Sequence, residues 1–182
     1  MYFYKELTQR LDLKPEDFDA TLQEKIERRL RQKIEGECLG GLGYVIAVMK
    51  MHEEGLDEGL LNDVDGTVTY NLKCDAVVCR PFKNEVVDAL VIQCNELGFF
   101  CSAGPVRIFV SRHGMPEDLQ NGFKIQDQAW VTDDGEVRIE PGCAVRVRIL
   151  NVSVQANEIS AIASISDDYM GLILSAEEGA TA

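Results

Sequence analysis

The chain has 182 residues, of which 46% are hydrophobic and 27% are charged. This is enough apolar material for one or two globular domains, and the mixture of charges with few prolines excludes disordered, collagen-like and coiled-coil compositions. No apolar stretch approaches the roughly 18 residues that a membrane span needs. The first residues also lack the basic start and long apolar run of a secretion signal, so we expect an intracellular protein.

The net charge of −13 results from 18 basic and 31 acidic side chains. Such a charge opposes non-specific attraction to nucleic acids, so any contact with RNA must be local. The six cysteines form no Cys-x-x-Cys pair, and there are only two histidines. Because a zinc site needs closely paired ligands, the sequence predicts buried free thiols, with no metal and no cofactor.

The first part of the chain predicts a strand followed by a helix. The strand covers Tyr2–Leu7, and a polar turn through Pro15 follows it. From Phe18 to Ile34 the apolar residues recur every four positions, which is typical of an amphipathic helix. Gly36 lies just past this stripe, where a left-handed helix cap is common.

Two extended segments complete this predicted domain. Glu37–Lys50 and Thr67–Val78 are rich in residues that favour strands, and His52–Gly66 between them is a long loop rich in glycine and acidic residues. The close glycines before Tyr44 predict a bulge or bend rather than a phosphate loop, because no Lys-Ser/Thr pair follows them. One helix on a small antiparallel sheet is an α+β arrangement.

After Pro81 the helical period disappears, and short β-rich runs alternate with turn residues. Five strands in this length favour a small closed barrel, of which the OB-fold is the commonest form. The variable stretch Glu117–Pro141, which contains Trp130, interrupts the barrel between its third and fourth strands. The five predicted strands are Glu85–Cys94, Gly98–Cys101, Val106–Val110, Ala144–Val152 and Glu158–Ile165.

The sequence contains no P-loop, dinucleotide fingerprint or nucleophile elbow, so a binding surface is favoured over an enzyme. Barrels that bind single strands stack bases on aromatic rings and place Lys and Arg along the backbone. For Phe99, Phe100 and Phe109 the alternative is a place in the barrel core, because neighbouring strand residues face opposite sides. The candidate RNA-binding residues are Lys83, Phe99, Phe100, Arg107, Phe109, Arg112, His113, Arg146 and Arg148.

Pro15 and five segments after it carry, in this order, a resemblance to a known family: Ile34–Cys38, Gly43–Val48, Arg80–Asp88, Val110–His113 and Asp167–Leu172. They resemble the larger stalk subunits of RNA polymerases, in particular the seventh subunit of eukaryotic RNA polymerase II, which is related to the larger stalk subunit of the archaeal polymerase. The resemblance covers nearly the whole chain, from the first residue to about residue 172.

The resemblance implies a fold and a set of partners. A truncated RNP-like tip domain over 1–80 would precede an all-β S1-type OB-fold barrel over 81–174, and the small and acidic residues of 175–182 suggest a disordered tail. The protein would be a non-catalytic nuclear subunit that forms a heterodimer with the smaller stalk subunit and contacts emerging RNA. Docking on the polymerase core near the clamp would involve Pro15, Gly55, Gly59 and Gly66 of the tip domain.

The chain departs from the family pattern in two places. Asn84 stands where the family usually has glycine, and Gln120–Val131 replaces a proline-rich loop. Within that segment, Gln128–Val131 is similar to the polymerase III relative. A stalk subunit of polymerase III or another nuclear polymerase is therefore the alternative, followed by a free S1-type RNA-binding factor. The 7 basic and 15 acidic residues of 81–182 argue against the free factor, which should be basic.

Overall fold

A computed structural model describes residues 1–52, 59–155 and 157–173 of the chain. These residues form two compact units: unit 1, Met1–Arg80, and unit 2, Pro81–Ala182. No helix among the described residues is long and apolar enough to cross a membrane.

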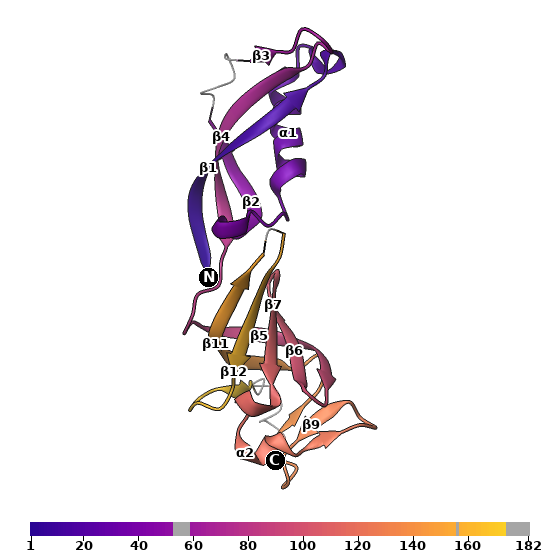
Figure 1. The fold of residues 1–182 in the computed structure, drawn as a ribbon, viewed down its shortest axis with the longest axis vertical. Helices are drawn as coiled ribbons and strands as arrows, with labels where there is room; N and C mark the ends of the chain where they lie inside the picture. The colour runs from indigo at the N-terminus through magenta and orange to yellow at the C-terminus, as the bar shows by residue number, and fades with distance from the viewer. Residues whose placement is uncertain (53–58, 156, 174–182) are drawn as a thin grey trace, which may run out of the picture. The chain divides into compact units, whose positions relative to one another are not determined.

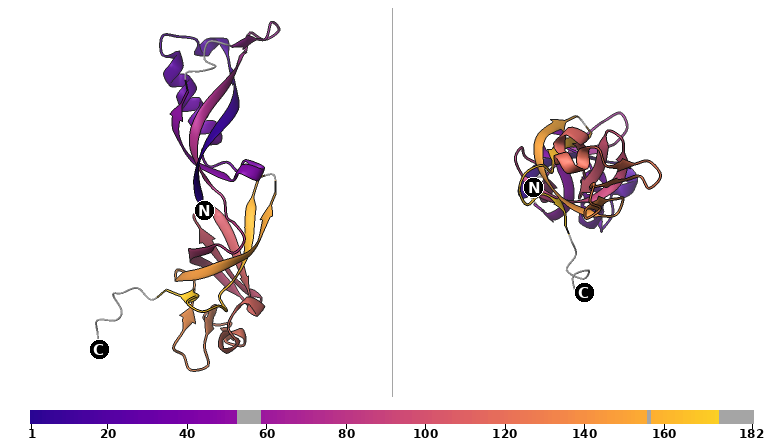
Figure 2. Two further views of the ribbon diagram at one scale, coloured as in Figure 1. Left: turned by 90° about the vertical axis from the view of Figure 1, so that its left-hand side faces the viewer. Right: turned by 90° about the horizontal axis from the view of Figure 1, so that it is seen from below.

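Unit 1 is an antiparallel sheet with one helix on one of its faces (Figures 1 and 2). The strand order is β1-β4-β2, and the short β3 pairs with one end of β4. The helix buries Ile26, Leu30 and Ile34 against the sheet, so its stripe of apolar residues packs on the buried face of the strands to form the core. The elements are β1 (Tyr2–Leu13), the 3₁₀ turn η1 (Pro15–Asp17), α1 (Leu22–Ile34), the 3₁₀ turn η2 (Gly40–Leu42), β2 (Tyr44–Met51), β3 (Leu60–Leu61) and β4 (Val68–Cys79).

Three predicted boundaries in unit 1 were wrong. The extended segment predicted from Glu37 becomes a strand only at Tyr44, because η2 precedes it. β1 continues to Leu13 because polar and buried residues alternate along it, so a segment that resembles a polar turn is a strand with one buried face. The helix begins at Leu22 rather than at Phe18, because Pro15–Asp17 forms a separate turn first. The predicted cap at Gly36 is confirmed by its left-handed φ of 85°.

The sheet bend near Gly43 has a steric cause. The glycines Gly40 and Gly41 lie in η2, and Gly43 follows with φ of 116°. A Cβ atom at Gly43 would lie 2.5 Å from the carbonyl oxygen of Cys79 on the paired strand. Only glycine allows the chain to enter β2 this close to β4.

Unit 2 is a closed five-stranded barrel. The strands lie in the order β12-β7-β6-β5-β11, and an additional pairing of β11 with β12 closes the sheet. The β12–β7 pair is parallel and the others are antiparallel, which is the topology of the predicted OB-fold. The predicted α+β class with a β-barrel is confirmed. The barrel strands are β5 (Val86–Asn95), β6 (Gly98–Ala103), β7 (Val106–Ser111), β11 (Ala144–Val154) and β12 (Ile159–Ser164).

The insertion between the third and fourth barrel strands forms its own small sheet, in the order β10-β9-β8. Trp130 is fully buried there, with its ring 5.1 Å from that of Phe123. After the barrel, β13 adds two residues to the edge of β11. The elements are the 3₁₀ turn η3 (Arg112–Gly114), α2 (Glu117–Gln120), β8 (Phe123–Lys124), β9 (Ala129–Val131), β10 (Arg138–Ile139) and β13 (Gly171–Leu172).

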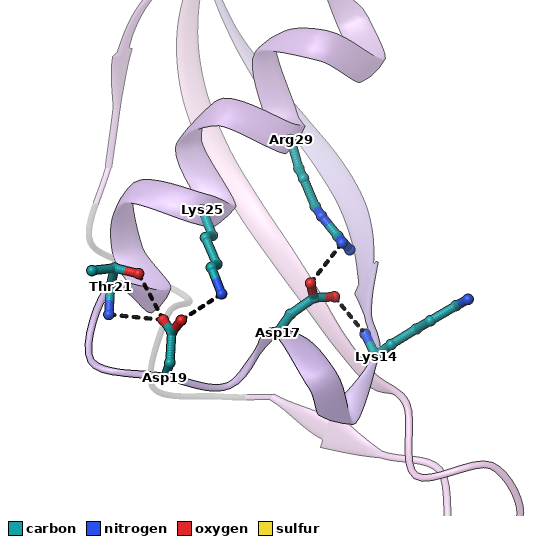
Figure 3. Close-up of polar contacts among 6 residues, drawn as sticks. All are labelled: Lys14, Asp17, Asp19, Thr21, Lys25 and Arg29. Carbon is teal, nitrogen blue, oxygen red and sulfur yellow. Dashed lines mark hydrogen bonds and ion pairs between the residues drawn. The ribbon is translucent and has the colours of Figure 1, made fainter.

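Two carboxylates tie the turn after β1 to α1 (Figure 3). Asp17 is only 7% exposed, and it accepts hydrogen bonds from Arg29 Nη2 at 2.6 Å and from the Lys14 N–H at 3.2 Å. Asp19 accepts hydrogen bonds from Lys25 Nζ at 2.5 Å and from the Thr21 N–H at 2.9 Å. The Lys25 ammonium and the Thr21 donors lower the pKa of Asp19 to about 2.

We expect Arg29→Met to destabilise unit 1 by about 1–3 kcal/mol, because the largely buried Asp17 carboxylate loses its charged partner. Arg28→Met, one position away on the exposed side of α1, should change stability by less than about 0.5 kcal/mol. Urea unfolding of the full chain, followed by helical circular dichroism, measures the difference. Fluorescence of Trp130 reports on unit 2 and should be unchanged. Equal loss in both variants would show that the Asp17 contact does not stabilise the turn.

Candidate nucleic-acid and docking surfaces

An aromatic row crosses the outer face of the barrel. Phe100 on β6 lies directly opposite Phe109 on β7, and their ring centroids are 4.8 Å apart at an interplanar angle of 42°. Phe109 in turn lies opposite Ile162 on β12, which is half exposed. The two rings are partly exposed, so they offer a surface on which a base can stack.

Phe99 does not belong to this row. Its side chain is fully buried in the barrel, because successive strand residues face opposite sides and Phe100 takes the outer position. The prediction that Phe99 stacks on RNA is therefore wrong, and its alternative place in the core is the one observed.

Several of the predicted cations of unit 2 are exposed. Arg107 lies two residues before Phe109 on β7 and so shares its face, and Arg112 follows the end of the same strand. Lys83 and His113 are also exposed. No acidic side chain among the described residues forms an ion pair with Arg107, Arg112 or Lys83. These three charges are thus available to a ligand.

The other two predicted arginines have acidic partners within the chain. Arg146 and Arg148 share the outer face of β11, as predicted from their spacing. Arg146 donates from Nε and Nη2 to the two carboxylate oxygens of Asp88 at 2.7 and 3.0 Å, and Arg148 lies 2.9 Å from an oxygen of Asp167. The Arg146 guanidinium lowers the pKa of Asp88 through these hydrogen bonds. The positive charge of these two arginines is therefore largely compensated by carboxylates of the chain itself.

One end of unit 1, here called the tip, holds the turn after β1, strand β3 and the start of β4, and it brings together some of the predicted docking residues. Pro15 is exposed, and a Cβ at Gly66 would lie 3.1 Å from its ring. Gly59 packs closely on Val68 and Tyr70, where a side chain would clash. Gly55 lies outside the described residues.

Sequence reasoning missed the apolar side chains of this tip. Leu60, Leu61 and Val64 are all highly exposed, and Leu60 is 67% accessible. They follow the glycines of a loop that otherwise carries acidic residues, and a pair of leucines in such a loop was the available signal. Exposed apolar side chains gathered at one end of a domain are typical of an interaction site.

The opposite end of β1 carries a second exposed apolar surface. Tyr2 and Tyr4 lie on the sheet face opposite α1, and Tyr4 is 64% exposed. Ile46 and Met49 of β2, at the two register shifts of that strand, are also exposed. Among the described residues β1 pairs only with β4, so its outer edge has no strand beside it. The backbone groups at an exposed strand edge can pair with another chain, so such an edge is usually covered or otherwise protected.

None of the six cysteines, all of which lie among the described residues, forms a disulfide; four are buried as predicted, whereas Cys38 and Cys143 are partly exposed. Burial raises the pKa of Cys101 to about 12 and contributes most to raising that of Cys94 to about 11. Thiols that stay protonated in this way are poor nucleophiles, so these two residues have a packing role.

The chain matches two family models. Residues 80–162 match the S1 RNA binding domain, and residues 8–71 match the SHS2 domain found in the N terminus of Rpb7p/Rpc25p/MJ0397. It is 38% identical to DNA-directed RNA polymerase II subunit 7 of Arabidopsis thaliana over 95% of this chain and 97% of that relative. It is 33% identical to subunit RPB7 of Saccharomyces cerevisiae over 95% of this chain and 100% of that relative.

The chain belongs to the Rpb7 family of RNA polymerase II subunits. The archaeal subunit Rpo7 of Saccharolobus solfataricus is more distant, with 27% identity over 76% of each chain. The Rpb7 resemblance inferred from the sequence is confirmed, and so is the order of an SHS2, or RNP-like, domain followed by an S1 domain. The names of these relatives favour the polymerase II assignment over the polymerase III alternative.

The Arg146–Asp88 pair leads to a prediction for the pKa of the Asp88 carboxyl group. In Arg146→Met the pKa of Asp88 should rise toward the ordinary range of an aspartate, because the carboxylate loses both hydrogen bonds. Carboxyl chemical shifts of Asp88 across a pH series measure it. Arg107→Met, which removes an unpaired arginine, should leave the Asp88 titration unchanged.

The lowered pKa of Asp88 also determines how the contribution of this ion pair to folding stability changes with pH. The folded-state pKa of Asp88 lies below the unfolded value, so the contribution of the pair is present above the unfolded pKa and disappears as pH falls through the folded one. The effect is small because both side chains are about half exposed. An Asp88 pKa that does not respond to Arg146→Met would show that the pair does not form in solution.

Proposed function

We propose that this chain is the larger stalk subunit of RNA polymerase II, a non-catalytic nuclear protein that forms a heterodimer with the smaller stalk subunit. The observation that carries the proposal is the 38% sequence identity to RNA polymerase II subunit 7, which extends over 95% of the chain and so includes both domains. The two exposed apolar surfaces of unit 1 support it, because a subunit that is permanently held in an assembly leaves such surfaces bare when it is alone.

The two ends of β1 suggest how these surfaces are divided. The tip end holds Pro15, Gly59 and Gly66 with the exposed Leu60 and Leu61, and we assign it to the polymerase core. The other end holds exposed tyrosines on a strand that has a strand neighbour on only one side among the described residues, which suits a partner that stays bound and packs on these side chains. We assign this end to the smaller stalk subunit.

The barrel contributes weak contacts to emerging single-stranded RNA. Phe100 and Phe109 provide the stacking surface, and Arg107, Arg112 and Lys83 provide unpaired charge. High affinity is not needed, because a subunit tethered to the polymerase meets the transcript at a high effective concentration. Arg146 and Arg148 contribute less than their spacing suggests, because Asp88 and Asp167 already compensate them.

Purification of the tagged chain from its native cell tests the division of unit 1. The triple variant Leu60→Ser, Leu61→Ser, Val64→Ser should lose co-purifying polymerase core but keep the smaller stalk subunit, because only the tip surface changes. The double variant Tyr2→Ser, Tyr4→Ser should lose the smaller subunit, because it changes only the exposed tyrosines at the other end of β1. Leu97→Ser, an exposed barrel leucine, is the matched control and should keep both. Full retention of the core by the tip variant would contradict the docking assignment, and absence of polymerase II subunits from the unmodified sample would overturn the proposed function.

RNA binding should depend on β7 far more than on β11. Arg107→Gln with Arg112→Gln should flatten the log–log salt dependence for single-stranded oligouridine by about 1.4, because two phosphate contacts are lost. Arg146→Gln with Arg148→Gln removes the same formal charge but should change the slope by less than half as much, because those arginines are paired. Phe100→Ala should cost about 1–3 kcal/mol of binding. Filter binding at several salt concentrations measures all three, and equal slopes for the two arginine pairs would contradict the assignment.

A further inference from the structure

Unit 2 contains a preformed cavity outside the aromatic face. The cavity has a volume of about 380 Å³ and is lined by three segments that are far apart in the sequence: 116–119, 132–137 and 165–172. Leu119 and Ile165 form its buried wall, and Val137, Met170 and Leu172 are partly exposed around it. This is enough space for one large aliphatic or aromatic side chain.

Hydrogen bonds, an ion pair and strand pairing hold two of the three walls in place. The Thr132–Val137 turn is closed by hydrogen bonds from the Thr132 N–H to the Val137 carbonyl and from the Val137 N–H to Thr132 Oγ1, each 3.0 Å. The Ile165 N–H donates to the Gly114 carbonyl at 2.8 Å. The ion pair between Arg148 and Asp167 and the β13–β11 pairing fix the last segment. A ligand would therefore meet a cavity in which these two walls need no ordering.

An exposed tyrosine lies in the third lining segment, 165–172. Tyr169 is 93% exposed and has a φ of 65°, a backbone conformation that a bulky residue rarely adopts. It directly precedes Met170, which lines the cavity. Its side chain makes no hydrogen bond or ion pair with the described residues of the unit, and tyrosine is among the residues that contribute most to protein interfaces.

The charge around the cavity identifies its ligand. The three lining segments carry seven acidic residues and no lysine, arginine or histidine; Arg148 pairs with one of them, Asp167, and Asp118 and Glu136 line the cavity itself. A field of this sign repels RNA and attracts a cationic partner. The residues that follow Ile173 include Glu177 and Glu178 and no basic residue, so the chain's own C-terminal end lacks the complementary charge.

We infer that this cavity is a docking site for a protein segment in which one large apolar side chain is flanked by lysine or arginine. The apolar side chain enters between Leu119 and Met170, and the flanking cations face Asp118 and Glu136. Tyr169 packs on the outer part of the bound segment. The site goes beyond the assignment to the polymerase and does not depend on it, because it rests on residues of unit 2 alone.

Fluorescence anisotropy with a defined peptide tests the site in the full chain. The probe is a short labelled peptide with a central leucine between lysines, and its two controls replace the leucine with serine or the lysines with glutamates. The probe should bind at least about tenfold more tightly than either control. Salt should weaken its binding. A serine peptide that binds equally well would overturn the site, because the attraction would then be only electrostatic.

Charge variants locate the binding. Asp118→Lys with Glu136→Lys should weaken the probe by about tenfold or more, whereas Glu117→Lys, on the same helix but outside the cavity lining, should weaken it by less than about threefold per charge. Tyr169→Asn should weaken the probe by about three- to tenfold while keeping the fold, because asparagine tolerates the left-handed conformation. Equal losses for Glu117→Lys and the cavity pair would overturn the inference.

Two further measurements separate this site from its alternatives. Methyl chemical shifts of Leu119, Ile165 and Leu172 should move when the probe is added, and shifts confined to other residues would refute the location. The probe should bind equally well when the smaller stalk subunit is present. Loss of binding in that pair would overturn the inference, because the cavity would then belong to the heterodimer interface.

Discussion

Strand β11 is the element on which the structure of unit 2 depends. Its first half pairs with β5 and its second half with β12, and the register shift between Ile149 and Asn151 bends it from one neighbour to the other. β13 adds to its remaining edge, and Arg148 on its outer face pairs with Asp167 in the segment that leads to β13. The exposed ion pair contributes little stability alone, but with the strand pairing it fixes where this segment lies. The cavity depends on that position, because the segment supplies one of its three walls.

Local patterns predicted most of the fold. The five barrel strands followed from alternation and turn residues, and the helix followed from its four-residue spacing. The extent of β1 was missed because its polar residues face solvent while Leu7, Leu11 and Leu13 face the core. Composition alone indicates a turn for such a segment, and only the period of two separates the alternatives.

The candidate sites were harder to predict because they depend on which distant residues meet. Phe99 and Phe100 are equivalent in the sequence, and the phase of β6 in the barrel decides which one faces outward. Arg146 and Asp88 are 58 residues apart, so their pairing depends on the β5–β11 register. The cavity near Tyr169 takes its lining from three separate segments. No single stretch of sequence carries its signal.

The pairing of charges explains how a chain with a net charge of −13 can present surfaces with opposite preferences. Arginines on β11 are compensated by nearby carboxylates, whereas Arg107 on β7 stays unpaired beside the aromatic row. Around the cavity the reverse holds, because the lining segments contain acids and no base. Since exposed charges are screened beyond roughly 8–10 Å in physiological salt, local composition rather than net charge decides which ligand each surface attracts. This separation of charge is the physical basis on which we propose RNA contacts on one face of the barrel and a basic segment at another site of the same unit.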